Sequence, residues 1–443
     1  ALLVFLIALA GYCCVRFLQR GALAWAAGIG VALGFAFLTK QLQGLLIAPG
    51  LAVAMLVSGA ITLRRRFVAL GVVVASALVS AGWWVAIVTL TPPGDRPYIG
   101  GSPTNSFLEL TFGYNGFQRL TGSKGSGLQS VWEGIGRLTS GAIGWLLPAA
   151  IILGTAAAIV MLLARHHRDP RFGLLLFGLL SIVVNGAALT MMSGIYHSYY
   201  TVVMAPAIAV VCALGATELW RYRALPWSRA ILTSASAISS VLALILLITH
   251  DLLLLLGFIP LAAAAGLSLA VQPTTNKRVR GVALIAIIAA LIGPLVYSMD
   301  TVRQPHSGSG PMAGPYPGRS APQHISPRLE DLLRTSAGQS DWVAAMIGSR
   351  PAAVLQLESE QGILPIGGDK KKDPAPTLDE FAQMVADHRI RWFIDGSAGS
   401  GEAKQIRDWV RAAFPYTIVG GARVYDLFQT PKIASSDPIP FVT

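Results

Sequence analysis

Apolar segments long enough to cross a membrane recur along the first 299 residues. We identify ten windows of roughly 17 to 25 residues, and a helix of that length spans a hydrocarbon core of about 30 Å. Their approximate limits are 1–18, 21–38, 44–61, 67–91, 141–163, 172–193, 200–219, 230–249, 252–271 and 281–299. Only 13% of the chain is charged, whereas a soluble domain carries about 25%. The pattern therefore predicts a mainly α-helical polytopic membrane protein and excludes an ordinary cytosolic protein.

The charges are divided unevenly between the apolar part and the rest of the chain. Up to Met299 there are 19 basic and 6 acidic residues, and from Asp300 onward there are 15 and 16. An excess of basic residues between apolar segments is typical of loops that orient membrane spans, and differs from the clustered footprint of a nucleic-acid binder. We therefore expect membrane lipid among the partners, and no nucleic acid.

The basic residues also predict the orientation of the spans, because Lys and Arg near span ends prefer the cytoplasmic side. Alternate connections carry 14 basic residues on one side and 5 on the other. This split predicts that the long loop 92–140 and everything after Met299 lie outside the cell. The expected location is the plasma membrane, crossed many times, with an extracytoplasmic C-terminal domain.

The chain changes character after the last window. Residues 304–323 read QPHSGSGPMAGPYPGRSAPQ, a Gly/Pro/Ser-rich composition typical of a linker. We divide the chain into a transmembrane region 1–299, a linker 300–325, a small soluble α/β domain 326–430 and a tail 431–443. About 110 residues of alternating strand and helix suffice for one core.

Local signals predict the elements of this small domain. Ser326 and Pro327 are typical of a helix start, and Thr377–Glu380 is a capping box. We further expect a helix over DWVAAMI after Ser340, strands at Ala353–Leu357, Ile363–Ile366 and Trp392–Ile394, a helix with the stripe Ile406, Trp409, Val410 and Ala413, and a hairpin at Tyr416–Leu427.

The loop 92–140 is the richest part of the apolar region in side chains that can touch a ligand. Its pocket candidates are Tyr98, Asn105, Glu109, Tyr114 and Asn115. Carboxylates, amides and hydroxyls supply hydrogen bonds, and the loop's glycines let the backbone approach closely. Two interpretations stay open: an interfacial loop with an amphipathic helix at Ser106–Leu110, or a lid over a site at the outer membrane face.

Cationic side chains at the outer ends of the windows suggest an anion site. The candidates are Lys40, Arg96, Arg119 and His197, and Tyr199 and Tyr200 follow closely on His197. Lys40 either snorkels to the interface or pairs with an anion, and the aromatic residues also suit an interfacial belt. Because the topology places all four cations at one level, a lipid-linked phosphate is the predicted ligand.

The sequence implies no particular cofactor. The three cysteines, Cys13, Cys14 and Cys212, lie in apolar runs without metal-ligand spacing, so no disulfide framework or zinc site is predicted. A divalent metal stays open as a cofactor. The chain opens with Ala inside an apolar run, which we interpret as a fragment that begins within a membrane helix.

Several strings resemble bacterial membrane glycosyltransferases of the protein-mannosyltransferase and aminoarabinose-transferase type. They are LTKQLQGLLIAP, GWWV, RPYIGGSPTNSFLELTFGYNGFQRLTG and YHSYYTVVMAPAIA. In the tail, WVAAMIGSRPAAVLQLES, ILPIGG, DPAPTLDEF and GGARVYDL are similar to the subgroup with an extracytoplasmic C-terminal domain. The tail departs from the subgroup at GGDKKKDPAPTL, where three lysines follow the glycines.

The resemblance implies a GT-C fold and transfer of a sugar from a polyprenyl-phosphate donor to a lipid, a cell-wall glycan or a protein. The lipid phosphate would leave, an aspartate would act as base, and cations would offset the departing charge. By position, Lys40 and His197 would face the donor phosphate, and Arg96 and its loop would shape the pocket. The family's acidic catalytic motif precedes these residues, so this part of the protein is not expected to catalyse alone.

Two alternatives of other classes stay open. A transporter or flippase of lipid-linked sugars would also have many helices and an outward anion site, although the predicted spans contain almost no acidic residues. A non-catalytic membrane scaffold would use its tail domain to recruit cell-envelope enzymes. The run DKKKD at Asp369–Asp373 is either a phosphate site or a solvated turn, and Asp251 either an intramembrane acid or a helix end near water.

Overall fold

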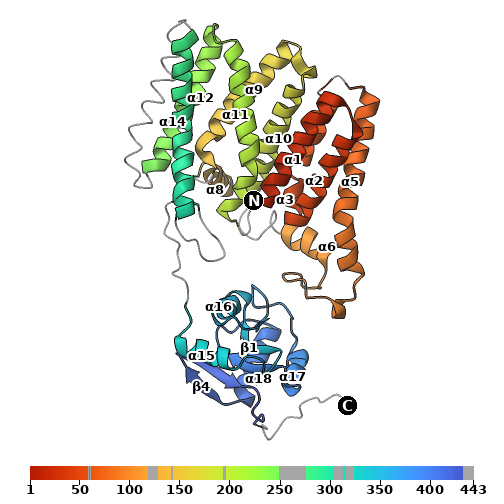
Figure 1. Ribbon diagram of the computed structural model, residues 1–443, viewed down its shortest axis with the longest axis vertical. Helices are drawn as coiled ribbons and strands as arrows, with labels where there is room; N and C mark the ends of the chain where they lie inside the picture. Colours follow the sequence, from red (N-terminus) through yellow and green to blue (C-terminus); the bar gives the residue numbers. More distant parts are fainter. Residues whose placement is uncertain are drawn as a thin grey trace. The chain divides into compact units, whose positions relative to one another are not determined.

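The computed structural model describes residues 1–57, 59, 61–117, 128–140, 143–192, 196–248, 276–303, 313–314 and 324–432. The chain forms two compact units (Figure 1). The first comprises Ala1–Ile87 and Asn115–Arg319, and the second comprises Val88–Tyr114 and Ser320–Thr443. The loop that follows α5 therefore belongs with the C-terminal domain rather than with the helices on either side of it.

The first unit is a bundle of helices that lie side by side (Figure 1). Its helices are α1 (Leu2–Arg20), α2 (Leu23–Lys40), α3 (Leu42–Leu45), α4 (Ala48–Val57), α5 (Leu63–Leu90), α8 (Leu128–Leu138), α9 (Leu147–Leu163), α10 (Pro170–Met191), α11 (Ala205–Arg221), α12 (Pro226–Ile248) and α14 (Asn276–Arg303). A 3₁₀ segment, Ser198–Met204, leads into α11.

Six helical stretches are long and apolar enough to cross a membrane. They are Leu2–Arg20, Leu23–Lys40, Leu63–Leu90, Gly144–Leu163, Pro170–Met191 and Ser198–Arg221, and they correspond to six of the ten predicted windows. Window 44–61 falls on the shorter apolar stretch Leu42–Val57. Windows 230–249 and 281–299 lie on α12 and α14, and window 252–271 falls outside the described residues. The prediction of a mainly helical membrane protein is confirmed.

The core of the first unit forms where α1, α4, α10 and α11 meet. Phe17 and Phe172 are almost completely buried there, together with Ile29 from α2. By contrast, α5 exposes large apolar side chains, including Val79 at 74% and Leu90 at 81%. A soluble protein rarely exposes so much contiguous apolar surface, so this face suits contact with lipid.

Small residues bring α2 close to α5. A Cβ placed on Gly30 would overlap the Ser76 hydroxyl, and one on Gly34 would overlap the Ser80 hydroxyl and lie 2.7 Å from the Ala77 carbonyl oxygen. Small residues spaced four apart allow helix backbones to approach this closely inside a membrane. The pair Gly30 and Gly34 therefore sets the packing of α2 on α5.

We expect Gly34→Ala to destabilise the bundle, because the added methyl must displace backbone of α5. Overpacking of this kind costs about 1–3 kcal/mol, and thermal unfolding of the full chain in detergent measures it as a lower Tm. Gly82→Ala in α5 is the matched control, because no described atom lies within 4 Å of a Cβ there. The control should gain about 0.5–1 kcal/mol from the helix preference of alanine. Equal Tm values for the two variants would refute the close packing.

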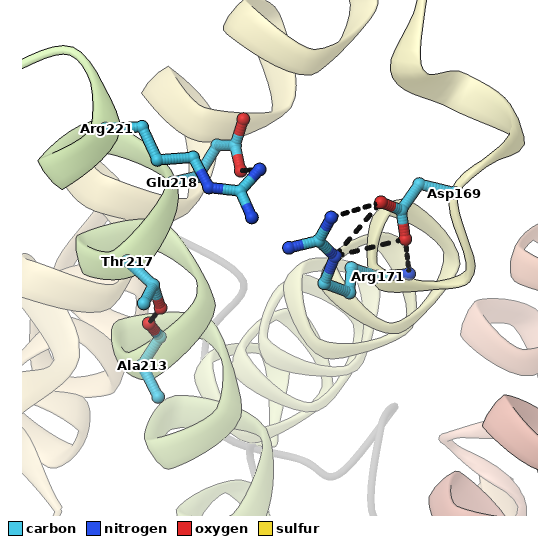
Figure 2. A network of polar contacts seen from close by, with 6 residues as sticks. All are labelled: Asp169, Arg171, Ala213, Thr217, Glu218 and Arg221. Carbon is cyan, nitrogen blue, oxygen red and sulfur yellow. Dashed lines mark hydrogen bonds and ion pairs between the residues drawn. The ribbon is translucent and has the colours of Figure 1, made fainter.

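Two local ion pairs lie near one another, one at the α9–α10 connection and one at the end of α11 (Figure 2). Asp169 caps α10 by accepting the Arg171 backbone N–H at 2.8 Å, and its carboxylate also pairs with the Arg171 guanidinium at 2.6 Å. On α11, Glu218 pairs with Arg221 at 3.0 Å. Burial on its own raises the pKa of Asp169, but the hydrogen bonds from Arg171 outweigh it and lower the pKa. These two basic connections belong to the group predicted to face the cytoplasm.

The C-terminal domain is a five-stranded sheet in the order β2-β1-β3-β5-β4. Its strands are β1 (Trp342–Ile347), β2 (Ile363–Ile366), β3 (Ile390–Ile394), β4 (Tyr416–Val419) and β5 (Ala422–Asp426). The first three are parallel, with Ala344 opposite both Ile363 and Trp392, and the β4–β5 hairpin adds two antiparallel strands. The sheet shows a parallel core extended by a hairpin, which confirms the predicted small α/β domain.

Helices cover both faces of this sheet. On one face, α17 (Leu378–Ala386) and α18 (Glu402–Ala413) bury Phe381, Phe393 and Ile406. On the other, α15 (Pro327–Thr335) and α16 (Ser349–Ser359) bury Leu333 and Leu355. The domain thus has three layers with a core on each side of the sheet.

Two element predictions in this domain are wrong. DWVAAMI contains strand β1 rather than a helix, because a short apolar run buried on both faces of a parallel sheet lacks a diagnostic period. Ala353–Leu357 lies in helix α16 rather than in a strand, because its alanine, leucine and glutamine favour a helix. The other predicted elements are confirmed, including the Ser326 cap, the Thr377 capping box, the Ile363–Ile366 strand and the closing hairpin.

A buried carboxylate follows β3 and joins it to α18. The Asp395 side chain is 4% exposed and accepts hydrogen bonds from Arg407 at 2.9 Å and Arg411 at 2.6 Å. Burial on its own raises the pKa of Asp395, but the two guanidinium groups outweigh it, so the pKa lies below its ordinary value. The native state therefore holds this carboxylate ionised.

We expect Asp395→Asn to lower the free energy of unfolding of this domain by about 1.5–3 kcal/mol at pH 7, the range for hydrogen bonds to charged groups. The pKa of Asp395 is lower in the native state than in the unfolded state, where it is about 3.9. The stabilisation by the ionised Asp395 carboxylate is therefore full above the unfolded pKa and is lost as the pH falls through the native pKa. Urea unfolding of the full chain, followed by proteolysis of the domain at pH 7 and pH 3.5, measures both effects. Asp408→Asn, which alters an exposed pair with Lys404, is the control. If Asp395→Asn lowered the free energy of unfolding equally at both pH values, Asp395 would not be the ionised, stabilising carboxylate described here.

Candidate functional site

Lys40 lies on two tyrosine rings from a distant part of the chain. It is the last residue of α2, and the chain then turns through Gln41, whose φ is 45°, into the short helix α3. The Lys40 Nζ is 3.9 Å from the ring centroid of Tyr200 and 4.8 Å from that of Tyr199. Ring faces attract an ammonium group through the negative face of the ring quadrupole.

His197 completes this group of side chains. Its ring stacks on Tyr199 at 5.3 Å with an interplanar angle of 11°, and meets the edge of Tyr200 at 5.3 Å and 82°. Tyr200 is buried, whereas Tyr199 is 41% exposed. We call Lys40, His197, Tyr199 and Tyr200 the Lys40 cluster. It brings an ammonium and an imidazole onto the same two tyrosine rings.

A hydrogen bond from Gln43 links the two segments that carry the Lys40 cluster. The Gln43 side chain on α3 donates a hydrogen bond from Nε2 to the Tyr200 carbonyl at 3.1 Å, which ties the end of α2 to the 3₁₀ segment. Gln43 stands in the LTKQLQ string that carries part of the resemblance, but no sequence signal marks it as a site residue. The bond gives this glutamine a positioning role for the cluster.

Arg137 on helix α8 contacts the end of α10 and Tyr196, which precedes the 3₁₀ segment. Its guanidinium lies 4.7 Å from the Tyr196 ring centroid and donates to the carbonyl oxygens of Met192 at 2.7 Å and Leu189 at 3.3 Å. A cation that binds the last carbonyls of a helix satisfies their free acceptors, here at the end of α10. The sequence predicted only that Arg137 is one of the basic residues of the outer loop.

The four predicted phosphate-facing cations have different surroundings. Lys40 and His197 both contact Tyr199 and Tyr200, and their role toward a phosphate stays a prediction. Arg119 falls in 118–127, outside the residues that the structure describes. Arg96 belongs to the second unit, and its guanidinium donates to the carbonyl oxygens of Asn105 at 2.6 Å, Thr91 at 3.2 Å and Val88. Arg96 therefore holds its own loop closed in this structure, and its contact with a phosphate stays a prediction.

Tyr98 and Asn105 also build the loop. The Tyr98 hydroxyl donates to the Ser102 carbonyl, and Asn105, with φ of 50°, accepts the Ile99 N–H on Oδ1 at 2.8 Å. Burial raises the pKa of Tyr98, and the carboxylates of Asp373 and Glu109 raise it further. These contacts give the segment 96–105 a defined shape, on which any pocket role would depend.

Glu109 offers the clearest ligand-directed group in the described part of this loop. Ser106 caps the short helix α6 (Phe107–Glu109), which continues as a π-helix over Leu110–Phe117. Among the described residues, the buried Glu109 Oε2 has no hydrogen-bond partner. A buried carboxylate oxygen left without a donor is costly, so a ligand hydroxyl would satisfy it. The side chains of Tyr114 and Asn115 lie outside the description.

Within the described ranges, no group of three His, Cys, Asp or Glu side chains could hold a metal ion. Cys13 and Cys14 are buried in α1, and Cys212 lies in α11. A divalent metal as a cofactor stays an open expectation from the sequence.

Two family models match separate parts of the chain. Residues 1–84 match the model described as dolichyl-phosphate-mannose-protein mannosyltransferase, and residues 329–413 match the one described as "Putative mannosyltransferase YkcB-like, C-terminal". These two regions of the chain are similar to mannosyltransferases by those descriptions. The first match contains Lys40, and the second runs through the sheet domain from α15 to α18.

Two curated relatives from Bacillus subtilis (strain 168) align along most of the chain. "Putative mannosyltransferase YkcB" is 23% identical over 519 aligned residues, covering 93% of this chain and 72% of that protein. "Putative mannosyltransferase YycA" is 21% identical over 514, covering 93% and 74%. No solved structure gives a significant match. The matches support a membrane glycosyltransferase, in agreement with the resemblance found in the sequence.

Proposed function

We propose that the protein transfers a sugar from a polyprenyl-phosphate donor to an extracytoplasmic lipid, glycan or protein, with the Lys40 cluster holding the donor phosphate. The single observation that carries this proposal is the position of the Lys40 ammonium on Tyr199 and Tyr200, next to His197. Apolar helix faces suit the polyprenyl chain, whereas the phosphate needs cationic partners at the membrane surface.

The chemistry assigns a role to each member of the cluster. An acceptor oxygen attacks the anomeric carbon, the bond from that carbon to the phosphate oxygen breaks, and the acceptor's proton passes to a base. Negative charge develops on the departing polyprenyl phosphate. Lys40 would stabilise that charge, His197 would donate a hydrogen bond to it, and the two rings would hold Lys40 in place. The proposal concerns the leaving-group side, since the resemblance assigns the base to a motif elsewhere in the protein.

The extracytoplasmic placement rests on the uneven distribution of basic residues. The ion pair of Asp169 with Arg171 lies where α9 joins α10, and that of Glu218 with Arg221 lies where α11 ends. The Lys40 cluster lies where α2 ends and where the chain enters α11. Because α11 runs from the Lys40 cluster to these ion pairs, the two features belong to opposite ends of the bundle. If the arginine-rich end faces the cytoplasm, the cluster faces outward.

Reconstituted full-length protein tests the proposal against lipid-linked sugar transport. Proteoliposomes receive polyprenyl-phosphate mannose, or in parallel polyprenyl-phosphate aminoarabinose, with a radiolabelled sugar and cell-envelope acceptors. We expect label to appear in a covalent product together with free polyprenyl phosphate. Label that crosses the bilayer but stays on the donor lipid would favour a flippase and overturn the proposal.

A further inference from the structure

A hydrogen bond joins two segments of the second unit that are far apart in sequence. The Gly101 backbone N–H, in the RPYIGGS segment, donates to Oδ2 of Asp373 at 3.0 Å. Asp373 belongs to the C-terminal domain, 272 residues further along the chain. This contact agrees with the grouping of Val88–Tyr114 with the C-terminal domain in one compact unit.

The domain holds Asp373 in a tightly folded turn between β2 and α17. The Gly367 N–H donates to the Ala375 carbonyl at 3.1 Å, and the Gly367 carbonyl accepts from Lys372 at 2.8 Å and Asp373 at 3.1 Å. A Cβ on Gly368 would overlap the Asp373 carboxylate, so only glycine fits beside it. Asp373 is 7% exposed, which shows a carboxylate enclosed by its contacts rather than displayed to solvent.

The RPYIGGS segment approaches this carboxylate at Gly100 and Gly101. A Cβ on Gly100 would lie 3.6 Å from Oδ2 of Asp373, which is ordinary contact distance, and Gly101 has a φ of 86°. The segment is held in shape by the bond from Tyr98 to the Ser102 carbonyl, with Ser102 completely buried. A backbone N–H to a carboxylate is a charge-assisted bond, stronger than a neutral one.

The carboxyl ends of the parallel strands, where α/β domains ordinarily bind ligands, are filled by the domain itself. The Lys371 ammonium donates a hydrogen bond to the Ser397 hydroxyl. The Lys371 side chain also packs against Gly348, where an added Cβ would lie 2.9 Å from the Lys371 Cε. The Lys371 carbonyl also accepts the Ser400 N–H at 2.9 Å. The loops after β1, β2 and β3 thus close on Lys371.

We propose that the C-terminal domain is a docking module for the RPYIGGS segment, with Asp373 as the positioning residue that anchors Gly100 and Gly101. The domain then acts on transfer by fixing this loop rather than by binding a sugar at its strand ends. The effect on transfer rests on the proposed function, whereas the docking contact does not.

Photo-cross-linking in the full-length protein tests the contact and leaves Asp373 in place. Cys13, Cys14 and Cys212 are replaced by Ala, and a short thiol-reactive photo-cross-linker is attached to a Gly100→Cys variant. The control is Gly94→Cys with the same reagent, because Gly94 lies in the same loop and no described atom is near its Cβ position. After irradiation and cleavage in the linker, we expect the Gly100→Cys protein to stay joined and the control to separate. Separation of both proteins would overturn the docking.

Sugar transfer by Asp373 variants tests whether Asp373 positions the RPYIGGS loop. We expect Asp373→Ala to reduce kcat/KM by about tenfold, because displacing a loop by about 1 Å costs rate. Asp373→Asn keeps an acceptor oxygen and should retain most of the wild-type kcat/KM. Asp369→Ala breaks an exposed ion pair with Arg350 and should not reduce kcat/KM. Unfolding of the domain is measured for each variant, and full activity of a folded Asp373→Ala protein would overturn the positioning role. A cross-link from Gly100→Cys, together with no sugar transfer by the wild-type protein, would refute the proposed function alone and leave the docking supported.

Discussion

Lys40→Met is expected to lower kcat for sugar transfer from a polyprenyl-phosphate donor by about 10²–10³-fold, the usual cost of removing one group that stabilises a developing anion. Methionine keeps the length and the apolar stem of lysine, so the Tyr199 and Tyr200 rings keep a neighbour and only the charge is lost. Transfer is measured with reconstituted full-length protein at saturating donor.

Two further variants separate charge from packing at this site. Lys40→Arg keeps the cation and should retain much more activity than Lys40→Met. Lys404→Met removes an exposed lysine that pairs with Asp408 on α18, and should leave transfer unchanged. If Lys40→Met protein transfers sugar at the wild-type rate, the Lys40 cluster has no part in stabilising the leaving phosphate.

Phe393→Ala is expected to lower the free energy of unfolding of the C-terminal domain by about 3–5 kcal/mol, the range for truncating a buried phenylalanine. Phe393 is completely buried in the central strand β3, with its ring in edge contact with Phe381 at 6.3 Å and Tyr425 at 6.0 Å. The change removes the centre of the core under α17 and α18. Urea-dependent proteolysis of the domain in the full chain measures the loss.

Ile418→Ala provides the matched control on the same sheet. Ile418 is 67% exposed on the edge strand β4, so its truncation should change stability by no more than about 0.5 kcal/mol. Similar effects for Phe393→Ala and Ile418→Ala would mean that the domain does not have the core described here.

The helical region was largely predictable from sequence, because length and apolarity are local properties of a span. The C-terminal domain was harder at two places. WVAAMI is too short for a helical or strand period to emerge, and its identity as β1 depends on pairing with both β2 and β3. Residues 353–357 were assigned to a strand although alanine, leucine and glutamine favour the helix that forms. Where a cap marks the element, as at Thr377, the prediction holds.

The candidate site shows the same division between local and tertiary information. Charge sidedness predicted that Lys40 and His197 share one side of the membrane, but it did not indicate that Tyr199 and Tyr200 would contact the lysine. Arg96 illustrates the converse, since an outward arginine suggests an anion partner while its actual partners are backbone carbonyls. Carbonyl positions depend on the folded path of the loop, which composition and spacing do not specify.

The proposed mechanism divides the work between the two units. The helical unit provides the Lys40 cluster and apolar faces for a lipid donor, and the second unit combines the RPYIGGS loop with the C-terminal domain through Asp373. On this account the carboxylate of Asp373 and the ammonium of Lys40 have separate tasks. Asp373 shapes a loop without touching the donor, whereas Lys40 interacts with the phosphate directly.

Binding of polyprenyl phosphate without its sugar tests the central claim most directly, because this lipid carries the phosphate and no transferable group. Titration of purified wild-type and Lys40→Met protein in nanodiscs yields both dissociation constants. The account predicts that the variant binds at least about tenfold more weakly, a difference of about 1.4 kcal/mol. Equal affinities would contradict it.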